Sequence, residues 1–231
     1  MQTTSSPTSA RLSSGSSSGP LVAWLSIAAL FVGAAFVGAS SGQTDPNILY
    51  KYTFALGSLA AYAVLVGITL GIAVWLGRPL ATLGMRRFSW AWFWAAVGVI
   101  VAVALLGAIL EPILHAGEEQ GLEPKAWDPN RAPAFVVNWT VAATLVPFAE
   151  ELFFRGLGVC ALLPIGGVAA VGITALTFGL GHGIIVALPV LVVFGAGLGW
   201  VRLRSGSVWP GVLAHSLYNG ALLAYVYVDL T

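Results

Sequence analysis

The chain has 231 residues, of which 58% are hydrophobic and only 8% are charged. A soluble domain carries about 25% charged residues, so this composition excludes an ordinary soluble fold and predicts an integral membrane protein. The formal net charge of +1 gives no reason to expect a nucleic-acid partner. The single cysteine, Cys160, excludes an internal disulfide framework and a cysteine-based metal cluster.

The first half of the chain is predicted to be a polar tail followed by three membrane spans. Residues 1–20 are rich in Ser, Thr and Gly, which predicts a disordered tail. Three apolar runs follow this tail. Each is close to the ~20 residues that a helix needs to cross the hydrocarbon core. We place these spans at Leu21–Ala39, Phe54–Leu76 and Trp90–Leu114. The first run is long for a signal peptide, so we expect an uncleaved span, and its small-residue end leaves cleavage open.

The second half is predicted to hold four more spans. We place them at about Ala134–Val159, Val168–His182, Ile184–Val201 and Val208–Val228. Gly179, Gly181 and Gly183 favour a broken helix at the boundary between the fifth and sixth spans. The sequence therefore predicts an all-α, polytopic bundle of about seven spans, with six or eight as alternatives. Residues 21–131 would form N-terminal spans and loops, and residues 132–231 a second region.

Arginines near the span ends predict the orientation, because cytoplasmic loops are enriched in Lys and Arg. They form two groups. The first is Arg78, Arg86 and Arg87, and the second is Arg202 and Arg204. With seven spans, both groups fall on the side of the N-terminus, which we expect to be cytoplasmic. The acidic loop Glu118–Arg131 would lie outside. Trp90 and Trp209 at span ends are expected to be interfacial anchors.

Three polar clusters interrupt the apolar runs of the second half. They are Glu150-Glu151-x-x-x-Arg155, Phe178-x-x-x-His182 and His215-x-x-x-Asn219. The i,i+4 spacing places both ends of each cluster on one helix face, so Glu151 can pair with Arg155 and leave Glu150 available. A charge at the centre of a membrane helix costs about 2.5–3.5 kcal/mol, so three charged side chains in one span indicate a functional site.

Side chains of these types can hydrolyse an amide without a serine or cysteine nucleophile. A carboxylate beside an imidazole can take a proton from water. A second imidazole and an amide can donate hydrogen bonds to a developing oxyanion. The same set contains ligands for a divalent metal such as zinc, in which case Glu150, His182 and His215 would hold it. The residues alone leave open whether a metal takes part.

A non-catalytic interpretation exists for each cluster. The acidic pair and its arginine could be a structural ion network, and each histidine could bond a backbone carbonyl. Asn219 could join two helices. Glu111 and His115, at the end of the third span, are expected to reach the membrane interface and take no part in the site.

The three clusters, in this order and on separate predicted helices, resemble the CPBP family. This family comprises CAAX proteases and bacteriocin-processing enzymes and is also called ABI. The resemblance covers about Ala132–Tyr227 and implies an intramembrane endopeptidase whose catalytic region is residues 132–231. It also implies that Glu151 and Arg155 shape the site through their pair, with Phe178 packed beside it.

The resemblance assigns the remaining roles as well. Glu150 and His182 would activate the attacking water, and His215 and Asn219 would stabilise the oxyanion. The substrate would be a membrane-anchored or lipidated protein, and the composition suggests a bacterial plasma membrane. The alternative function is a non-enzymatic membrane protein, either a transporter or an immunity or scaffold protein, that uses the cluster for binding or proton relay.

One geometric difficulty accompanies the seven-span arrangement. Simple alternation puts His182 toward the outer end of the fifth helix and His215 toward the inner part of the seventh. Both belong to the expected site and should meet. A short or tilted fifth helix, or a broken piece near Gly179–Gly183, would bring them together.

Overall fold

The computed structural model describes residues 19–40, 45–77, 80–115 and 127–230. Its main helices are α1 (Gly19–Ser40), α2 (Tyr52–Trp75), α3 (Trp90–Leu114), α5 (Ala132–Ala143), α6 (Leu145–Glu150), α7 (Val159–Leu162), α8 (Gly167–Leu180), α9 (Leu188–Ser205) and α10 (Trp209–Leu230). A π-helical segment, Glu151–Gly158, joins α6 to α7. Within these described ranges no β-strand occurs, so the predicted all-α class is confirmed. The expected polar tail lies outside them, except that its last two residues begin α1.

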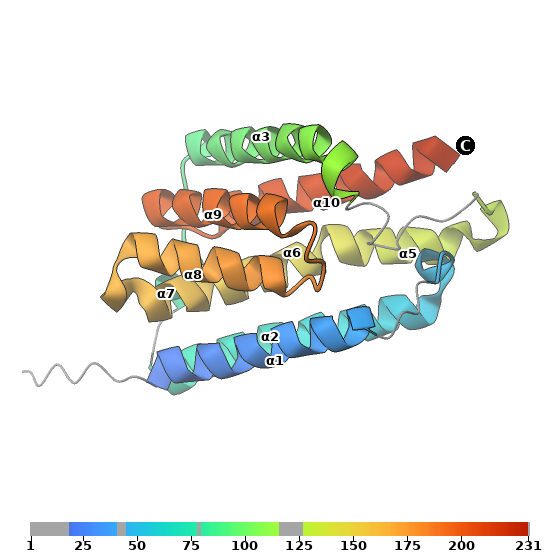
Figure 1. The fold of residues 1–231 in the computed structure, drawn as a ribbon. Helices are drawn as coiled ribbons and strands as arrows, with labels where there is room; N and C mark the ends of the chain where they lie inside the picture. The colour runs from blue at the N-terminus through green and yellow to red at the C-terminus, as the bar shows by residue number, and fades with distance from the viewer. Residues whose placement is uncertain (1–18, 41–44, 78–79, 116–126, 231) are drawn as a thin grey trace, which may run out of the picture.

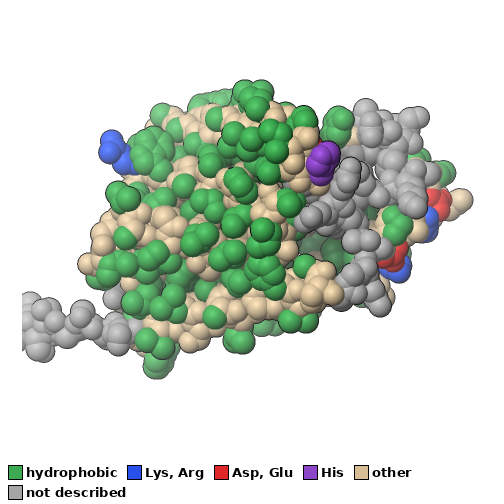
Figure 2. All heavy atoms as spheres, viewed as in Figure 1, with side chains coloured by type: hydrophobic (Ala, Val, Ile, Leu, Met, Phe, Trp, Pro, Cys, Tyr) green, Lys and Arg blue, Asp and Glu red, His purple; other side chains and the backbone are tan. Residues whose placement is uncertain are grey.

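The helices form a bundle with an apolar flank. α1, α2, α3, α9 and the run Pro129–Ile165 are each long and apolar enough to cross a membrane, whereas α8 is apolar but shorter. Figure 1 shows the helices running along one direction, with α9 between α3 and α8. On the face drawn in Figure 2, hydrophobic side chains cover the flank, and charged side chains lie at the two ends. The chain is therefore an integral membrane protein.

The fourth predicted span is not one continuous helix. α5 ends at Ala143, and Thr144 leaves helical geometry with φ −124° and ψ −67°. Pro147 follows in the first turn of α6 and has no N–H to donate to the carbonyl of Ala143. The chain then widens into the π-helical segment, in which every residue is buried. π-Helical turns are rare and are frequent at functional sites. This one carries Glu151 and Arg155.

A tryptophan of α1 packs across the π-helical segment. The indole Nε1–H of Trp24 donates to the backbone oxygen of Phe153 over 3.2 Å. The two rings stack with their centroids 5.9 Å apart. Gly158 leaves the space for this contact, because a Cβ there would lie 2.6 Å from the indole nitrogen. The indole thus satisfies a carbonyl beside a widened turn.

Replacing Trp24 by phenylalanine should therefore destabilise the fold. Trp24→Phe keeps an aromatic ring but leaves the Phe153 oxygen without its donor, which costs about 1–3 kcal/mol for a buried group. Thermal unfolding of the purified protein in detergent would measure the loss. Trp75→Phe is the control, because Trp75 is 75% exposed on the bundle flank. Equal melting temperatures for the two variants would contradict this assignment.

α8 is the short helix of the bundle. It has 14 residues, about 21 Å at 1.5 Å per residue, and the chain turns at Gly181–Gly183 before α9 begins at Leu188. Gly183 has a φ of +71°, and a Cβ there would lie 2.8 Å from the Ala35 oxygen of α1. The predicted break near Gly179–Gly183 is therefore present, and the fifth helix is short.

Candidate active site

Four charged or titratable side chains meet in the interior of the bundle. Glu150 at the end of α6, Glu151 and Arg155 in the π-helical segment, and His215 on α10 are each at most 3% exposed. The Arg155 Nη1 atom lies 3.0 Å from Glu151 Oε1. Its Nη2 atom donates to the backbone oxygen of Gly195 on α9 over 3.3 Å. The ion pair expected from the i,i+4 spacing is thus formed, in a site without solvent exposure.

His215 lies between the two carboxylates. Its Nδ1 atom is 3.2 Å from Glu151 Oε1, the same oxygen that forms the ion pair with Arg155. Its Nε2 atom is 3.8 Å from Glu150 Oε2, too far for a direct hydrogen bond. Gly211, one turn earlier on α10, lets this helix approach, because a Cβ there would lie 2.7 Å from Glu151 Oε2.

Glu150 has a partner that the sequence analysis missed. The hydroxyl of Tyr62 on α2 donates to Glu150 Oε1 over 3.1 Å. This brings α2 into the site although it lies outside the three motifs. A signal was available, because Tyr62 sits near the middle of the apolar run Phe54–Leu76, whereas tyrosines of membrane helices usually gather at the interfaces.

His182 lies in the turn after α8, at the margin of the cluster. Its Nδ1 atom is 2.9 Å from the Phe178 carbonyl oxygen. A carbonyl only accepts, so Nδ1 carries the proton and Nε2 is left as an acceptor. The residue is exposed on the protein surface. Within the described part of the chain, no hydrogen bond or ion pair joins it to the glutamates.

The ring of Phe178 connects the parts of the site. It lies 4.7 Å from the His182 ring and 6.0 Å from the His215 ring, measured between centroids. The guanidinium carbon of Arg155 lies 4.3 Å from its centroid, within the range of a cation–π contact. The structure therefore brings the two histidines against one aromatic ring and not into polar contact with each other.

Asn219 lies one turn after His215 on α10, as the motif predicts, but its amide points to a different partner. Its Nδ2 atom donates to the Ala142 carbonyl oxygen over 3.0 Å, at the point where α5 breaks. Asn219 thus ties α10 to the break between α5 and α6. A side-chain amide has two N–H groups, and this bond uses one of them.

The residues expected to hold a metal do not converge on one point. Glu150 and His215 approach to 3.8 Å, and His182 remains at the margin. Across the described ranges, no group of three or more His, Cys, Asp or Glu side chains is arranged to hold a metal ion. In this arrangement the three residues do not fit a zinc site, in which the ligands surround one ion at about 2 Å.

Comparison with known proteins finds a family that part of the chain resembles. Residues 132–221 match the family described as type II CAAX prenyl endopeptidase, Rce1-like. Residues 132–221 are an Rce1-like region. The match begins at α5 and ends within α10, so it contains all three motifs. No curated protein and no solved structure matches the chain.

The Rce1-like region confirms the resemblance inferred from the motifs. Together with the membrane-spanning helices, this match makes residues 132–221 similar to an intramembrane protease in general terms. The N-terminal helices lie outside the match, yet α1 and α2 contribute Trp24 and Tyr62 to the neighbourhood of the cluster.

Proposed function

We propose that the chain is an intramembrane endopeptidase that hydrolyses a peptide bond of a membrane-anchored or lipidated protein. The observation that carries the proposal is the buried cluster of two carboxylates, one guanidinium and one imidazole inside the Rce1-like region. A structural ion pair would need only Glu151 to match Arg155. Glu150 is bonded instead to the neutral hydroxyl of Tyr62, which leaves it available to accept a proton.

In this proposal, Glu150 is the general base. Tyr62 holds Oε1, so Oε2 faces His215. Oε2 and the His215 Nε2 atom are 3.8 Å apart, so a single water can reach both at hydrogen-bond distance. Glu150 takes a proton from this water as its oxygen attacks the peptide carbonyl carbon. The carboxyl group then gives the proton to the leaving amine as the C–N bond breaks.

His182, His215 and Asn219 keep the roles that the family resemblance implies. His182 offers the acceptor Nε2 to the attacking water together with Glu150. The Nε2–H of a doubly protonated His215, whose Nδ1–H stays on Glu151, and the second amide N–H of Asn219 donate to the oxyanion of the tetrahedral intermediate. Phe178 fixes His182, because its ring and its carbonyl oxygen both contact the imidazole.

The substrate is proposed to reach the site from the bilayer. The cluster lies within membrane-spanning helices, so the scissile bond must come from a protein that is itself held in the membrane. Prenylated C-termini are the substrate that the family description names. The arginine-bearing end of the bundle, where α1 begins and α9 ends, is proposed to face the cytoplasm of a bacterium.

Reconstituted protein would test the proposal. Proteoliposomes of the full chain would be incubated with membrane-tethered peptides in two sets, one with prenylated C-termini and one with unprenylated, lipid-anchored segments. Mass spectrometry would locate each cut, and Glu150→Gln proteoliposomes would be the blank. Cleavage at one bond type by the wild-type protein alone would support an endopeptidase and name its substrate class. Intact peptides in both sets, from folded protein, would count against it.

Tyr62→Phe should slow cleavage without unfolding the protein. It removes only the hydroxyl that orients Glu150, and a hydrogen bond to a charged group contributes about 1.5–3 kcal/mol. We expect the maximal cleavage rate to fall about 10- to 100-fold with little change in KM, measured on a substrate found as above. Tyr225→Phe is the matched control, because Tyr225 is 66% exposed. Unaltered cleavage by Tyr62→Phe would remove Tyr62 from the site.

A further inference from the structure

A second polar feature lies at the arginine-bearing end of the bundle. An open pocket of about 640 Å³ is formed where the segment before α3 meets the start of α10. Its lining residues are Met85, Arg86, Arg87, Phe88, Trp90 and Trp209. None of them belongs to the buried cluster. The Trp209 ring stacks on Phe148, two residues before Glu150, with the ring centroids 5.8 Å apart. The lining thus combines two cations with apolar and aromatic side chains.

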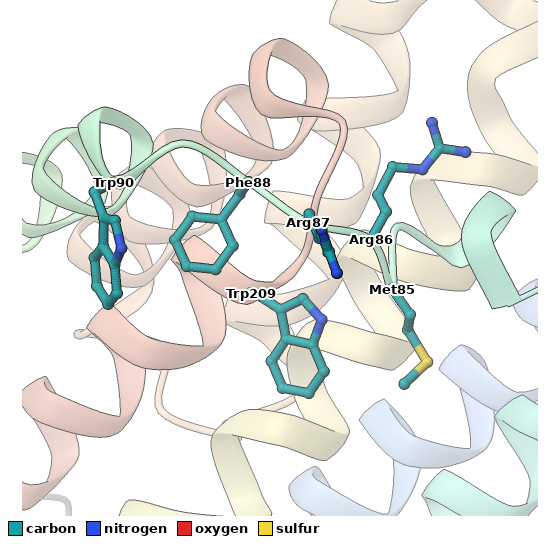
Figure 3. Close-up of a pocket in the computed structure, with 6 residues that line it drawn as sticks. All are labelled: Met85, Arg86, Arg87, Phe88, Trp90 and Trp209. Atoms are coloured by element: carbon teal, nitrogen blue, oxygen red, sulfur yellow. The ribbon is translucent and has the colours of Figure 1, made fainter.

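The pocket carries an uncompensated positive charge. Arg87 is exposed and makes no hydrogen bond or ion pair with any residue that the structure describes. Figure 3 shows its side chain directed toward Met85 and Trp209, whereas Arg86 extends away from them. The Arg86 Nε atom is already bonded to the Ala81 oxygen over 3.0 Å.

The nearby charges reinforce this field. Arg202 and Arg204 close α9 at the same end. The acidic side chains that the structure describes outside the buried cluster are Asp45, Glu111 and Asp128, and they lie on elements at the opposite end of the bundle. The first turn of α10, which Trp209 begins, adds the positive end of a 22-residue helix. An anion is therefore the ligand that this pocket favours.

The aromatic lining indicates what the anion is attached to. Trp90 is 65% exposed at the start of α3, and tryptophans at span ends lie at the level of lipid headgroups. A basic pocket between membrane helices at that level is suited to a phosphate headgroup, and acyl chains can lie along Phe88 and Trp90. We infer that this pocket binds the phosphate headgroup of an anionic phospholipid, with Arg87 as the principal contact.

The test compares lipids on the purified full-length protein in neutral detergent. Phosphatidylglycerol and phosphatidylcholine would be titrated, and binding followed by native mass spectrometry and by the melting temperature, since a ligand of the folded state raises it. We expect the wild-type protein to prefer phosphatidylglycerol. Arg87→Gln should weaken that binding about tenfold or more, as expected for one charge-assisted hydrogen bond. Its exposed position lets the variant fold.

Arg204→Gln is the matched control, because it removes the same charge at the same end without touching the pocket. If both variants weaken phosphatidylglycerol binding equally, the binding reflects general electrostatic attraction, and the proposed site is wrong. Equal binding of the two lipids would also overturn it. Soluble glycerol phosphate is the last arm. If it binds as tightly as the lipid, the ligand is free phosphate and the lipid assignment fails. If a peptide with a free C-terminal carboxylate binds more tightly than the lipid, the pocket is a site for the substrate C-terminus, and the lipid assignment is wrong.

Discussion

Glu150→Gln is expected to lower the cleavage rate about 10²- to 10⁴-fold, the range for loss of a general base. The substitution removes the acceptor that takes the proton from water. The glutamine keeps the side-chain shape, and its amide oxygen can still accept from the Tyr62 hydroxyl. The variant should therefore fold, with the melting temperature of the wild-type protein or slightly above it. Single-turnover cleavage in proteoliposomes would measure the rate.

Glu111→Gln makes the same chemical change at the far end of α3, where the side chain is exposed, and should cleave at the wild-type rate. A variant at position 150 that retains more than about a tenth of the activity would contradict the role of general base. Cleavage lost equally in both variants would point to an effect on the protein as a whole. Comparing the two variants separates the loss of the general base at position 150 from any general effect of removing one carboxylate.

Arg155→Met should be the most destabilising single change in the site. It leaves the carboxylate of Glu151 buried with no arginine, and breaking a buried ion pair from one side costs about 3–5 kcal/mol. Methionine fills part of the volume, so the loss reports mainly on charge. Unfolding of the purified protein by a denaturing detergent, at a fixed micelle composition, would measure it.

The double variant Glu151→Gln with Arg155→Met completes the cycle. Removing both charges should recover most of the stability lost in the single variant, because neither charge is then left alone in the interior. Arg204→Met, on the exposed last turn of α9, is the control for loss of an arginine. A double variant as unstable as Arg155→Met would mean that the arginine acts through packing on Phe178 instead.

The predictable parts of this protein rest on local patterns. Apolar runs of about 20 residues predicted where the helices lie, because the thickness of the bilayer sets the length of a membrane helix. Of the seven predicted spans, five helical runs in the described part of the chain are long and apolar enough to cross a membrane. The i,i+4 spacing predicted the pairing of Glu151 with Arg155, which lies within one segment. The glycines from 179 to 183 predicted the break after α8, because glycine readily adopts the positive φ that such a turn can require. Gly183 does adopt a positive φ there.

The parts that sequence reasoning missed depend on contacts between distant segments or on backbone register. Tyr62 and Glu150 are 88 residues apart in the sequence, and no local pattern around either residue predicts that the two are in contact. The π-helical segment has no characteristic spacing over its eight residues. One amide N–H of Asn219 donates to the Ala142 carbonyl beside the break at Thr144, a contact that the motif does not predict. That break follows from a proline placed three residues later, whose effect on the helix was not considered.

The length of α8 also has a consequence for the lipid around the protein. Its 14 residues span about 21 Å, against about 30 Å of hydrocarbon in a typical bilayer. Such a mismatch is relieved by local thinning of the bilayer. Thinning would let water and headgroups descend to His182, so the hydrolytic water need not cross a full apolar layer. Under the proposed function, cleavage should then be faster in bilayers of short-chain lipids and slower in thick ones.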